Sequence, residues 1–229
     1  MPSMKHDYQL QRFDKLDSTN DWLKRNYASQ MDGSVILAKQ QTKGRGRFER
    51  TWESNEDLTF SILYKQAFPY PIIFPLALVK ALESFGMQAM IKWPNDILLN
   101  GKKVCGILIE TVYEVSKKAA MIVGIGINVT QKKGELADKA GYVAVDKEEL
   151  LQAVLTQCER CRQLPLETLL QTYQNYHVLK GRKIWLDDVL WEVKEVTSEG
   201  GLRICTAQTT RILCSEEISL SNIYKERNL

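Results

Sequence analysis

The sequence predicts an α+β fold in which helices flank a mixed β-sheet and a small β-barrel-like domain follows it. Short apolar runs with strand periodicity dominate the middle of the chain. Helical periodicity is confined to residues 71–85 and 146–177 in addition to a short N-terminal helix. After Gly181 only short β runs remain. We therefore expect two domains, residues 1–179 and residues 180–229.

The first third of the chain alternates between strands and polar turns. Residues 8–16 have strand character, and residues 17–20 supply helix-capping side chains before a helix that starts at Asp21. A second short β run covers residues 34–38. Apolar side chains then alternate strictly, as a strand requires, at Leu58, Phe60, Ile62 and Tyr64.

The middle of the chain contains the clearest hairpin. Asn100-Gly101 favours the turn geometry that matches strand twist, so residues 97–99 and 102–110 should pair. Another apolar strand covers residues 119–129, and Pro165 divides the following helical region into two helices. The C-terminal β runs are residues 183–186, 190–196, 202–207, 211–214 and 217–220.

Composition excludes several classes of protein. The 229 residues contain 31 Lys and Arg against 28 Asp and Glu, a net charge of +3, which is too balanced for a general nucleic-acid or membrane binder. No apolar run approaches the roughly 20 residues that span a bilayer, and the N-terminus lacks an apolar signal region. We expect a cytoplasmic protein.

Cysteine and histidine contribute little chemistry. Five scattered cysteines do not form a disulfide framework, which favours a reducing compartment. Cys158 and Cys161 have a zinc-like spacing without a matching half, so we expect a buried thiol pair. His6 and His177 are the only histidines, which removes most nucleophile–histidine schemes. Any catalysis should work by electrostatics and positioning.

A basic, glycine-rich loop at residues 41–52 is the strongest chemical signal. It contains four cations around Gly44 and Gly46, which are Lys43, Arg45, Arg47 and Arg50. Glycine lets backbone amides approach a ligand closely, and arginine forks match phosphate or carboxylate oxygens. Taken alone, the loop is compatible with a phosphate site, a solvated basic loop or a nucleic-acid contact.

Three more segments depart from ordinary strand composition. Residues 92–96 read KWPND, Lys103 starts an apolar strand that also contains Gly106, and residues 124–128 read GIGIN. Glycine inside a strand often marks the close approach of a ligand. Each segment taken singly is better explained by a turn, a strand end or a bulge. Their occurrence together favours a binding site.

These segments, in this order, resemble the biotin–protein ligases, also called biotin–[acetyl-CoA-carboxylase] ligases. The resemblance extends over nearly the whole chain, from Ser18-Thr19-Asn20 to the tail at residues 215–220. It implies a class II synthetase-like catalytic domain of the biotin–lipoate ligase type, followed by an SH3-like domain. It also implies a two-step reaction: biotin and MgATP give biotinyl-5′-adenylate, and biotin then passes to a lysine of a carrier.

The same resemblance assigns site residues, leaving any metal ligands unidentified. It makes Lys103, Arg47 and Arg45 catalytic. Biotin would be bound by Ser18, Thr19, Asn20, Gln41, Gly44, Arg45, Gly46, Arg47, Lys103, Gly106, Gly124 and Gly126, with the glycines leaving room for the ligand. ATP or the adenylate would be bound by Arg47, Arg50, Trp52, Asn95, Asp96, Lys103 and Asn128. The electrostatic reason is that a carboxylate and a triphosphate repel, so cations must hold both.

Alternatives and partners follow from the same comparison. Lipoate–protein ligases have a related fold, but the GRGR and KWPND segments fit biotin ligases better. Some biotin ligases carry an N-terminal DNA-binding domain, and the first motif begins here at Asp17, so no DNA binding is expected. The implied partner is the biotin carboxyl carrier domain of a biotin-dependent carboxylase. No membrane partner is expected, and a homodimer is compatible with the family.

Overall fold

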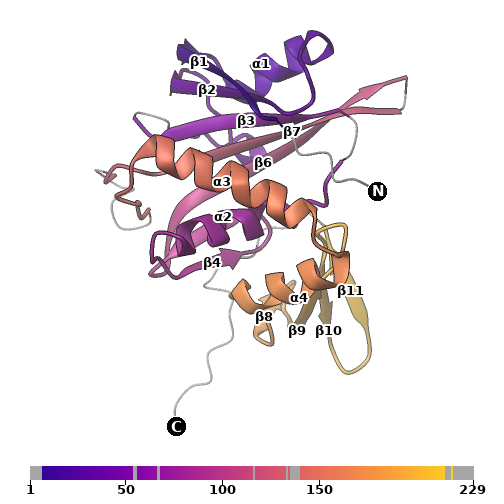
Figure 1. The fold of residues 1–229 in the computed structure, drawn as a ribbon. Helices are drawn as coiled ribbons and strands as arrows, with labels where there is room; N and C mark the ends of the chain where they lie inside the picture. The colour runs from indigo at the N-terminus through magenta and orange to yellow at the C-terminus, as the bar shows by residue number, and fades with distance from the viewer. Residues whose placement is uncertain are drawn as a thin grey trace.

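The computed structural model describes residues 7–53, 56–65, 68–115, 117–132, 134, 140–214 and 218, and its larger element is a seven-stranded mixed sheet. The strands lie in the order β1-β2-β3-β7-β6-β5-β4 (Figure 1). β1 and β2 are parallel, and every other neighbouring pair is antiparallel. Their bounds are β1 Gln9–Leu16, β2 Ser34–Gln41, β3 Leu58–Tyr64, β4 Ala89–Lys92, β5 Asp96–Leu99, β6 Lys102–Glu114 and β7 Lys117–Ile127.

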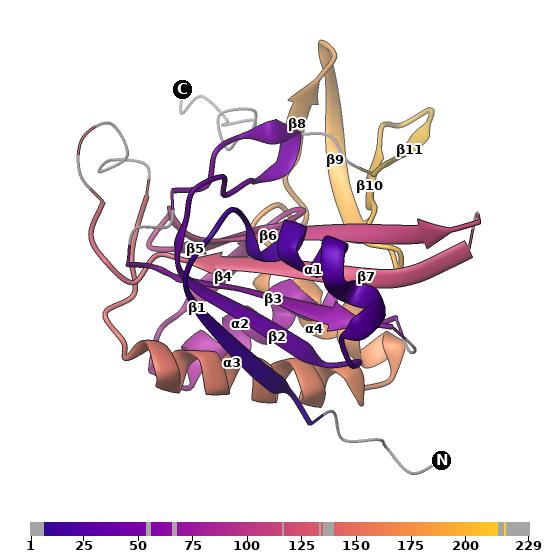
Figure 2. The same cartoon turned by 90° about the horizontal axis from the view of Figure 1, so that it is seen from above.

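Helices cover both faces of this sheet (Figure 2). α1 (Thr19–Asn26) packs on β3 and β7 from one side, whereas α2 (Ile73–Glu83) and α3 (Lys147–Arg162) pack against each other on the opposite side. α4 (Leu166–Tyr176) contacts β4 of this sheet and β9 of the second one. Two short 3-10 turns are η1 (Tyr27–Ser29) and η2 (Arg47–Glu49).

Local chemistry explains where these helices begin. Ser18 caps α1 because its hydroxyl accepts a hydrogen bond from the Asp21 amide at 3.3 Å. Asp146 caps α3 in the same way through the amides of Glu148 and Glu149. Pro165 ends the run of α3 and stands as the cap of α4, as the sequence predicted.

The core is thickest on the α2–α3 side of the sheet. All seven residues of β3 are buried, because helices cover that strand from both faces. A smaller apolar cluster lies under α1 and is formed by Leu23, Ile36, Leu63, Ala120 and Ile122. Along β7 the residues that follow Ala120 and Ile122 on this α1 face are Gly124 and Gly126. The apolar packing therefore stops where the glycines begin.

The predicted hairpin is confirmed, with one feature that the sequence did not indicate. Asn100 and Gly101 both have positive φ values, 51° and 76°, as the Asn-Gly turn requires. Pairing between β5 and β6 then shifts register, so that Val104 is an extra, bulged residue on β6. The bulge reverses the alternation and turns Lys103 to the same face as Gly106.

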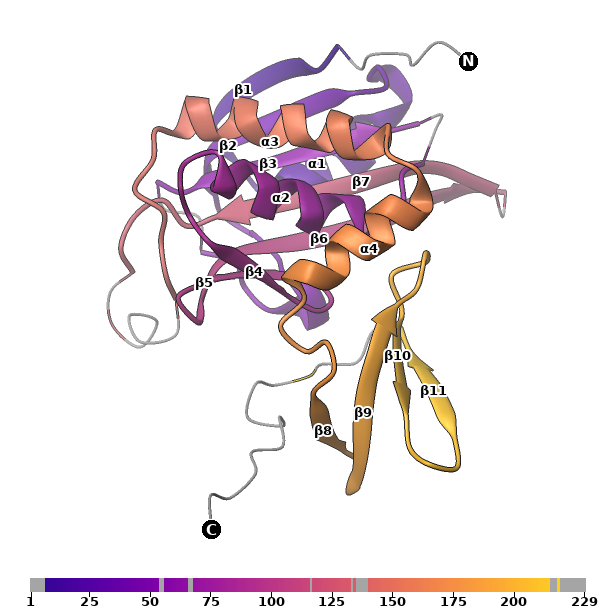
Figure 3. The same ribbon diagram turned by 60° about the horizontal axis from the view of Figure 1, so that its bottom comes forward.

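The second sheet has four antiparallel strands in the order β11-β10-β9-β8 (Figure 3). They are β8 (Lys183–Leu186), β9 (Val189–Val196), β10 (Leu202–Cys205) and β11 (Thr210–Leu213). The run expected at residues 217–220 lies outside the described residues except for Ile218. Strand β4 was not predicted, because four residues of mixed polarity carry little periodicity.

A hydrogen bond joins the KWPND segment to the second sheet. The Trp93 indole N–H donates to the Gly200 carbonyl at 2.8 Å, within the turn that joins β9 and β10. His177 is buried directly after α4, and burial lowers its pKa to about 4. His177 forms an isolated β-bridge with Ile91 of β4, and the centre of its ring lies 5.7 Å from that of Tyr173 on α4.

The structure describes the two cysteines of α3 and the lengths of the helices. Cys158 and Cys161 are buried on α3, and burial raises the pKa of Cys161 to about 11 and that of Cys158 further. The expected buried thiol pair is confirmed. Within the described ranges, no helix is long and apolar enough to cross a membrane.

Candidate functional site

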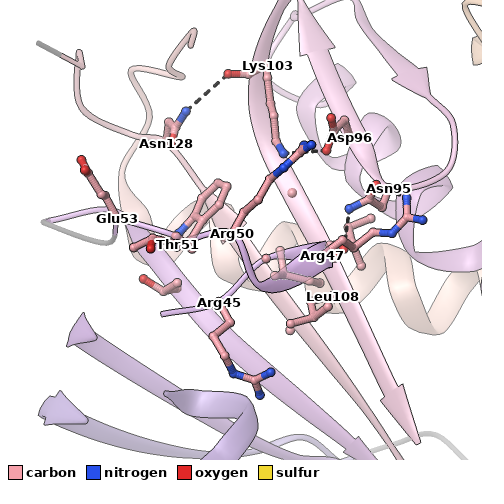
Figure 4. A pocket seen from close by; sticks show the side chains of 18 of the residues that line it. Arg45, Arg47, Arg50, Thr51, Glu53, Asn95, Asp96, Lys103, Leu108 and Asn128 are labelled. Atoms are coloured by element: carbon pink, nitrogen blue, oxygen red, sulfur yellow. Dashed lines mark hydrogen bonds and ion pairs between the residues drawn. The ribbon is translucent and has the colours of Figure 1, made fainter. Parts of the chain in front are cut away.

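A cavity of about 580 Å³ lies on the α1 face of the first sheet, between the basic loop and strands β5, β6 and β7. Figure 4 shows the side chains that surround it. Every residue that the sequence assigned to binding or catalysis lines this cavity, with Gly44 as the exception. The predicted segments, which are separated by up to about a hundred residues in the chain, therefore meet at one place.

One end of the cavity is built from side chains that bond to one another. Gln41 Oε1 accepts hydrogen bonds from the Thr19 amide at 2.8 Å and from its hydroxyl at 3.1 Å. The Ser61 hydroxyl lies 2.7 Å from Thr19 Oγ1 and 2.5 Å from Asn20 Oδ1. Asn20 Nδ2 donates to Glu110 Oε2 at 2.8 Å. We refer to Thr19, Asn20, Gln41, Ser61 and Glu110 as the amide network.

Gly124 lies directly beside this network and also lines the cavity. A Cβ atom built on Gly124 would lie 2.4 Å from Asn20 Oδ1. The space beside this glycine is therefore filled by the Asn20 carboxamide. Gly124 permits the close seating of Asn20, which lies buried at the cavity wall.

Arg45 leaves the cavity centre and turns toward α1, away from Lys103 (Figure 4). Its guanidinium forms an ion pair with Asp21 and lies 3.4 Å from Glu110 Oε1. The hydrogen bond to Asp21 raises the pKa of Arg45. Lys24 also pairs with Glu110, at 2.5 Å. In this structure Arg45 anchors the basic loop to α1 and β6 through these two carboxylates.

The basic loop folds as a small turn of its own. The Gly46 amide donates to the Arg50 carbonyl at 2.7 Å, and the Trp52 amide donates to the Gly44 carbonyl at 2.9 Å. Gly44 is buried beneath this turn, where a Cβ would lie 2.4 Å from the Trp52 carbonyl oxygen. Gly44 is thus needed for the loop backbone and does not reach the cavity. Arg47 Nη1 donates to Asn95 Oδ1 at 3.2 Å and joins the loop to the KWPND segment.

Trp52 fills the space beside two of the glycines. Gly106 and Gly126 are paired across β6 and β7. A Cβ on Gly126 would lie 2.4 Å from the Trp52 ring, and one on Gly106 would lie 3.1 Å from it. Both glycines line the cavity beside the Trp52 indole, which also lines it, and the absence of a Cβ atom allows the indole to lie this close to the sheet.

The other end of the cavity is rich in positive charge. Lys103 pairs with Asp96 at 2.6 Å and lies 5.6 Å from the centre of the Trp52 ring, while Lys92 lies 3.9 Å from Asp96. Of the lining residues, six are Lys or Arg and two, Glu53 and Asp96, are acidic. This balance suits a ligand with several negative charges. We refer to Arg47, Arg50, Lys92, Lys103 and Lys132 as the cationic wall.

Asn128 holds the backbone near Lys103. Its side-chain amide donates to the Lys103 carbonyl at 3.3 Å and to the Gly141 carbonyl at 2.9 Å. Its own backbone amide donates to the Val104 carbonyl at 2.8 Å. Asn128 lines the cavity, as expected of a nucleotide contact, but its side-chain N–H groups serve to fix the position of Lys103.

Sequence reasoning missed four functional candidates. Glu110 carried a signal, because it follows Gly106 at strand spacing and a charged residue there is unusual in an apolar strand. Ser61 carried a weaker one, as a small polar residue in a buried strand. Asp57 and Lys132 carried none, since their contact joins residues 75 positions apart.

No group of three or more His, Cys, Asp or Glu side chains suited to a metal ion occurs among the residues that the structure describes. Magnesium usually binds through one or two carboxylates together with substrate phosphates. Asp96 offers one such carboxylate at the cationic wall. The residues thus fit a magnesium ion that arrives with a nucleotide, and do not fit a metal site built from protein ligands alone.

Curated proteins with similar sequences include several biotin ligases. The chain is 38% identical to the bifunctional ligase/repressor BirA of Bacillus subtilis over 122 residues, which is 49% of this chain and 38% of that protein. It is 39% identical to the biotin–[acetyl-CoA-carboxylase] ligase of Paracoccus denitrificans over 127 residues, 50% of this chain and 52% of that protein. The matched region therefore spans less than two thirds of the length of these relatives.

A solved structure resembles the chain over a longer range. The biotin protein ligase from Aquifex aeolicus in complex with biotin and ATP superimposes with a TM-score of 0.75 and 28% identity, and covers 92% of this chain and 97% of that one. The model of the biotin/lipoate A/B protein ligase family matches residues 10–128, which contain the basic loop, the KWPND segment and the paired glycines. That match covers more than half of the 229 residues, and the chain belongs to the biotin/lipoate A/B protein ligase family.

Proposed function

We propose that this protein is an ATP-dependent biotin–protein ligase, which forms biotinyl-5′-adenylate and transfers biotin to a lysine of a carrier protein. The observation that carries the proposal is one cavity, about 580 Å³ in volume, with an amide network at one end and a cationic wall at the other. Its size falls within the usual range of small-molecule sites. Biotin combines a neutral ureido ring with a carboxylate, and ATP adds a polyanion, so the two ends match both substrates.

In this proposal the amide network recognises the ureido ring. Ser18, Thr19, Asn20 and Gln41 offer hydroxyl and carboxamide groups that can donate to the ring carbonyl and accept from its N–H groups. Because these side chains already bond to one another, little rotamer entropy remains to be lost on binding. Loss of a single partner would leave a buried polar group unpaired, which gives such sites their selectivity.

The cationic wall serves the first chemical step. A biotin carboxylate oxygen attacks the α-phosphorus of ATP, the bond to the β-phosphate oxygen breaks, and pyrophosphate leaves. Lys103 and Arg47 neutralise the charge that develops on the phosphoryl oxygens, and Arg50 and Lys92 add to the same field. Asp96 holds Lys103 in place, and Asp96 and Asn95 would supply oxygens for the magnesium ion when MgATP is bound.

The product of this step is a mixed anhydride, which reacts with water. It must be shielded from water until the second step, the transfer of biotin to the carrier. Trp52 and the basic loop lie at the cavity, and their closure over the adenylate would exclude water. In the second step a lysine amine attacks the acyl carbon, the bond to the phosphate oxygen breaks, and AMP leaves. The acceptor we propose is the biotin carboxyl carrier domain of a biotin-dependent carboxylase.

The proposal includes the division into a catalytic domain, residues 1–179, and an SH3-like domain, residues 180–229. The separate second sheet supports this division. It also includes a cytoplasmic location and the absence of DNA binding, and it is compatible with a homodimer. Cell fractionation tests the location, gel retardation tests DNA binding, and light scattering measures the oligomeric state.

The experiment that tests the function is mass-spectrometric detection of the acyl-adenylate after the protein is mixed with MgATP and either biotin or lipoate. Biotinyl-5′-adenylate alone is the expected result. Lipoyl-adenylate alone would replace the proposal with the lipoate branch of the same family, and neither product would overturn both. The names of the related ligases, which are biotin ligases, favour the biotin branch.

A further inference from the structure

A buried ion pair lies at the cavity wall, and the proposed scheme assigns no individual role to either of its members. Asp57 immediately precedes β3, and its side chain is fully buried, with 0% of its surface exposed. Its carboxylate accepts hydrogen bonds from the Val129 amide at 3.2 Å and from the Thr130 hydroxyl at 3.3 Å, and pairs with Lys132. All three partners belong to the segment that follows β7.

Lys132 is the member of this pair that reaches the cavity. It lines the cavity, while Asp57 does not. Its side chain retains 12% exposure. A lysine ammonium has three N–H donors, and the bond to Asp57 uses one of them, so two remain for groups in the cavity or for water.

The position of the segment relates Lys132 to Lys103. The segment starts at Asn128, whose amide groups bind the carbonyls of Lys103 and Val104. The Asp57 contacts then fix the next four residues. Lys103 and Lys132 thus belong to one hydrogen-bonded unit and face the same cavity from two chain segments, β6 and the end of β7.

Burying a charge pair completely is costly, and a hydrophobic pair of the same size is often as stable. In this pair the carboxylate is fully buried and the ammonium lies at a ligand cavity. The pair is therefore better explained by a role of the ammonium in ligand binding than by a contribution to stability. Lysine acts as a compact point charge, which suits phosphate oxygens. The ureido ring of biotin is neutral and needs no cation at its end of the cavity, whereas the nucleotide has several negative charges.

We infer that Lys132 is a nucleotide phosphate-binding residue that contacts the β- and γ-phosphate end of ATP, and that Asp57 is the residue that positions it. The inference rests on the proposed function for the identity of the nucleotide. It adds a binding residue and a positioning residue that no sequence motif indicated.

The test uses a double variant because Lys132→Met alone would leave Asp57 buried and unpaired, and could prevent folding. Asp57→Asn with Lys132→Met removes both charges, and the Asn carbonyl oxygen can still accept from the Val129 amide. The matched control is Asp14→Asn with Lys39→Met, a pair at 2.7 Å that is almost fully exposed. Isothermal titration would measure the affinities for a non-hydrolysable ATP analogue, AMP and biotin.

The expected result is an affinity for the ATP analogue lowered about ten-fold, a change of about 1.4 kcal/mol, with the affinities for AMP and biotin unchanged. Lys132→Arg should restore most of the loss, because it keeps a cation beside Asp57, and Asp57→Asn alone should give an intermediate loss. The control pair should match the wild type. A folded double variant with wild-type affinity for the ATP analogue would overturn the inference.

The outcome is separable from that of the proposed function. If the wild type binds the ATP analogue but forms no biotinyl-adenylate, the ligase proposal fails while the phosphate role of Lys132 is still decided by the affinity ratio. If the double variant loses affinity for AMP as much as for the ATP analogue, Lys132 does not read the terminal phosphates and the inference fails. Equal loss of biotin affinity would likewise contradict it.

Discussion

The two ends of the cavity are organised in opposite ways. The amide network satisfies its own hydrogen bonds: Gln41, Thr19, Ser61, Asn20 and Glu110 form one continuous chain, and Glu110 is the acceptor at its end. The cationic wall instead gathers positive side chains from the basic loop, from β4, from β6 and from the segment after β7. One end is held together by its own contacts, and the other by contacts to carboxylates and backbone around it.

This difference teaches how one site serves two kinds of substrate. A neutral ring is recognised by hydrogen bonds of fixed direction, so its site gains from being rigid before the ligand arrives. A polyanion is recognised by net charge, and like charges held together are tolerable only when a counterion or ligand is near. Asp96 and Asp57 provide that compensation from behind the wall. Substitutions at the two ends should therefore fail in different ways.

The largest effect is expected for Lys103→Ala at the cationic wall. Loss of an ammonium aimed at the developing phosphoryl charge should lower the rate of adenylate formation about 10²- to 10³-fold. Folding should persist, because Lys103 is partly exposed and Asp96 keeps Lys92 as a neighbour. Biotin-dependent pyrophosphate release measures the rate. The neighbouring Lys102→Ala, on an exposed position, is the control, and near-normal turnover of Lys103→Ala would remove that lysine from the mechanism.

The second effect contrasts two arginines of the same loop. Arg47→Ala should slow adenylate formation about 100-fold and shorten the lifetime of the bound adenylate, since Arg47 lines the cavity and joins the loop to Asn95. Arg45→Ala should change the affinity for biotin more than the chemical step, because Arg45 pairs with Asp21 and Glu110. Rapid-quench kinetics with release of labelled adenylate separates the two. Equal changes in the rate of adenylate formation and in biotin affinity for both variants would contradict separate roles for Arg45 and Arg47.

The third effect concerns the glycines of β7. Gly124→Ala places a Cβ 2.4 Å from Asn20 Oδ1, so the carboxamide must move and the amide network must open. The affinity for biotin should fall about 30-fold, the cost of one or two buried hydrogen bonds, while the affinity for ATP stays constant. Gly126→Ala pushes on the Trp52 indole and should shorten the adenylate lifetime instead. Equilibrium titration measures the affinities, and a normal biotin affinity for Gly124→Ala would show that Asn20 is not a ligand contact.

Much of the fold could be predicted from the sequence because local signals and tertiary packing agree. The strict alternation in β3, the Asn-Gly turn before β6 and Pro165 between α3 and α4 each have a local cause that the structure retains. Strand β4 was missed because its four residues show no clear period. The tail at residues 215–220, with Glu216-Glu217, lies outside the described residues apart from Ile218.

The candidate site was predictable as a set of residues and less so as a set of contacts. Family motifs indicated which side chains gather at the cavity, since a motif preserves residue type and order. They could not indicate that Asn20 and Trp52 occupy the space beside the glycines, because this depends on long-range packing. The bulge at Val104, which turns Lys103 to the cavity, and the contact of Asp57 with Lys132 are likewise properties of the folded chain.

The smallest effect is expected for Glu110→Gln, and it tests whether the amide network is held together by charge. Glutamine can still accept from Asn20 Nδ2 but no longer carries the charge that pairs with Lys24 and Arg45. A charge-assisted hydrogen bond contributes about 1.5–3 kcal/mol, and part of it is retained, so the biotin affinity should fall about ten-fold. The affinity for ATP should not change, because none of these groups belongs to the cationic wall. Glu148→Gln, which breaks an exposed pair with Arg12, is the control and should alter neither affinity. An equal loss of biotin and ATP affinity in Glu110→Gln would mean that the two ends are coupled through the basic loop, and that Arg45 transmits the change.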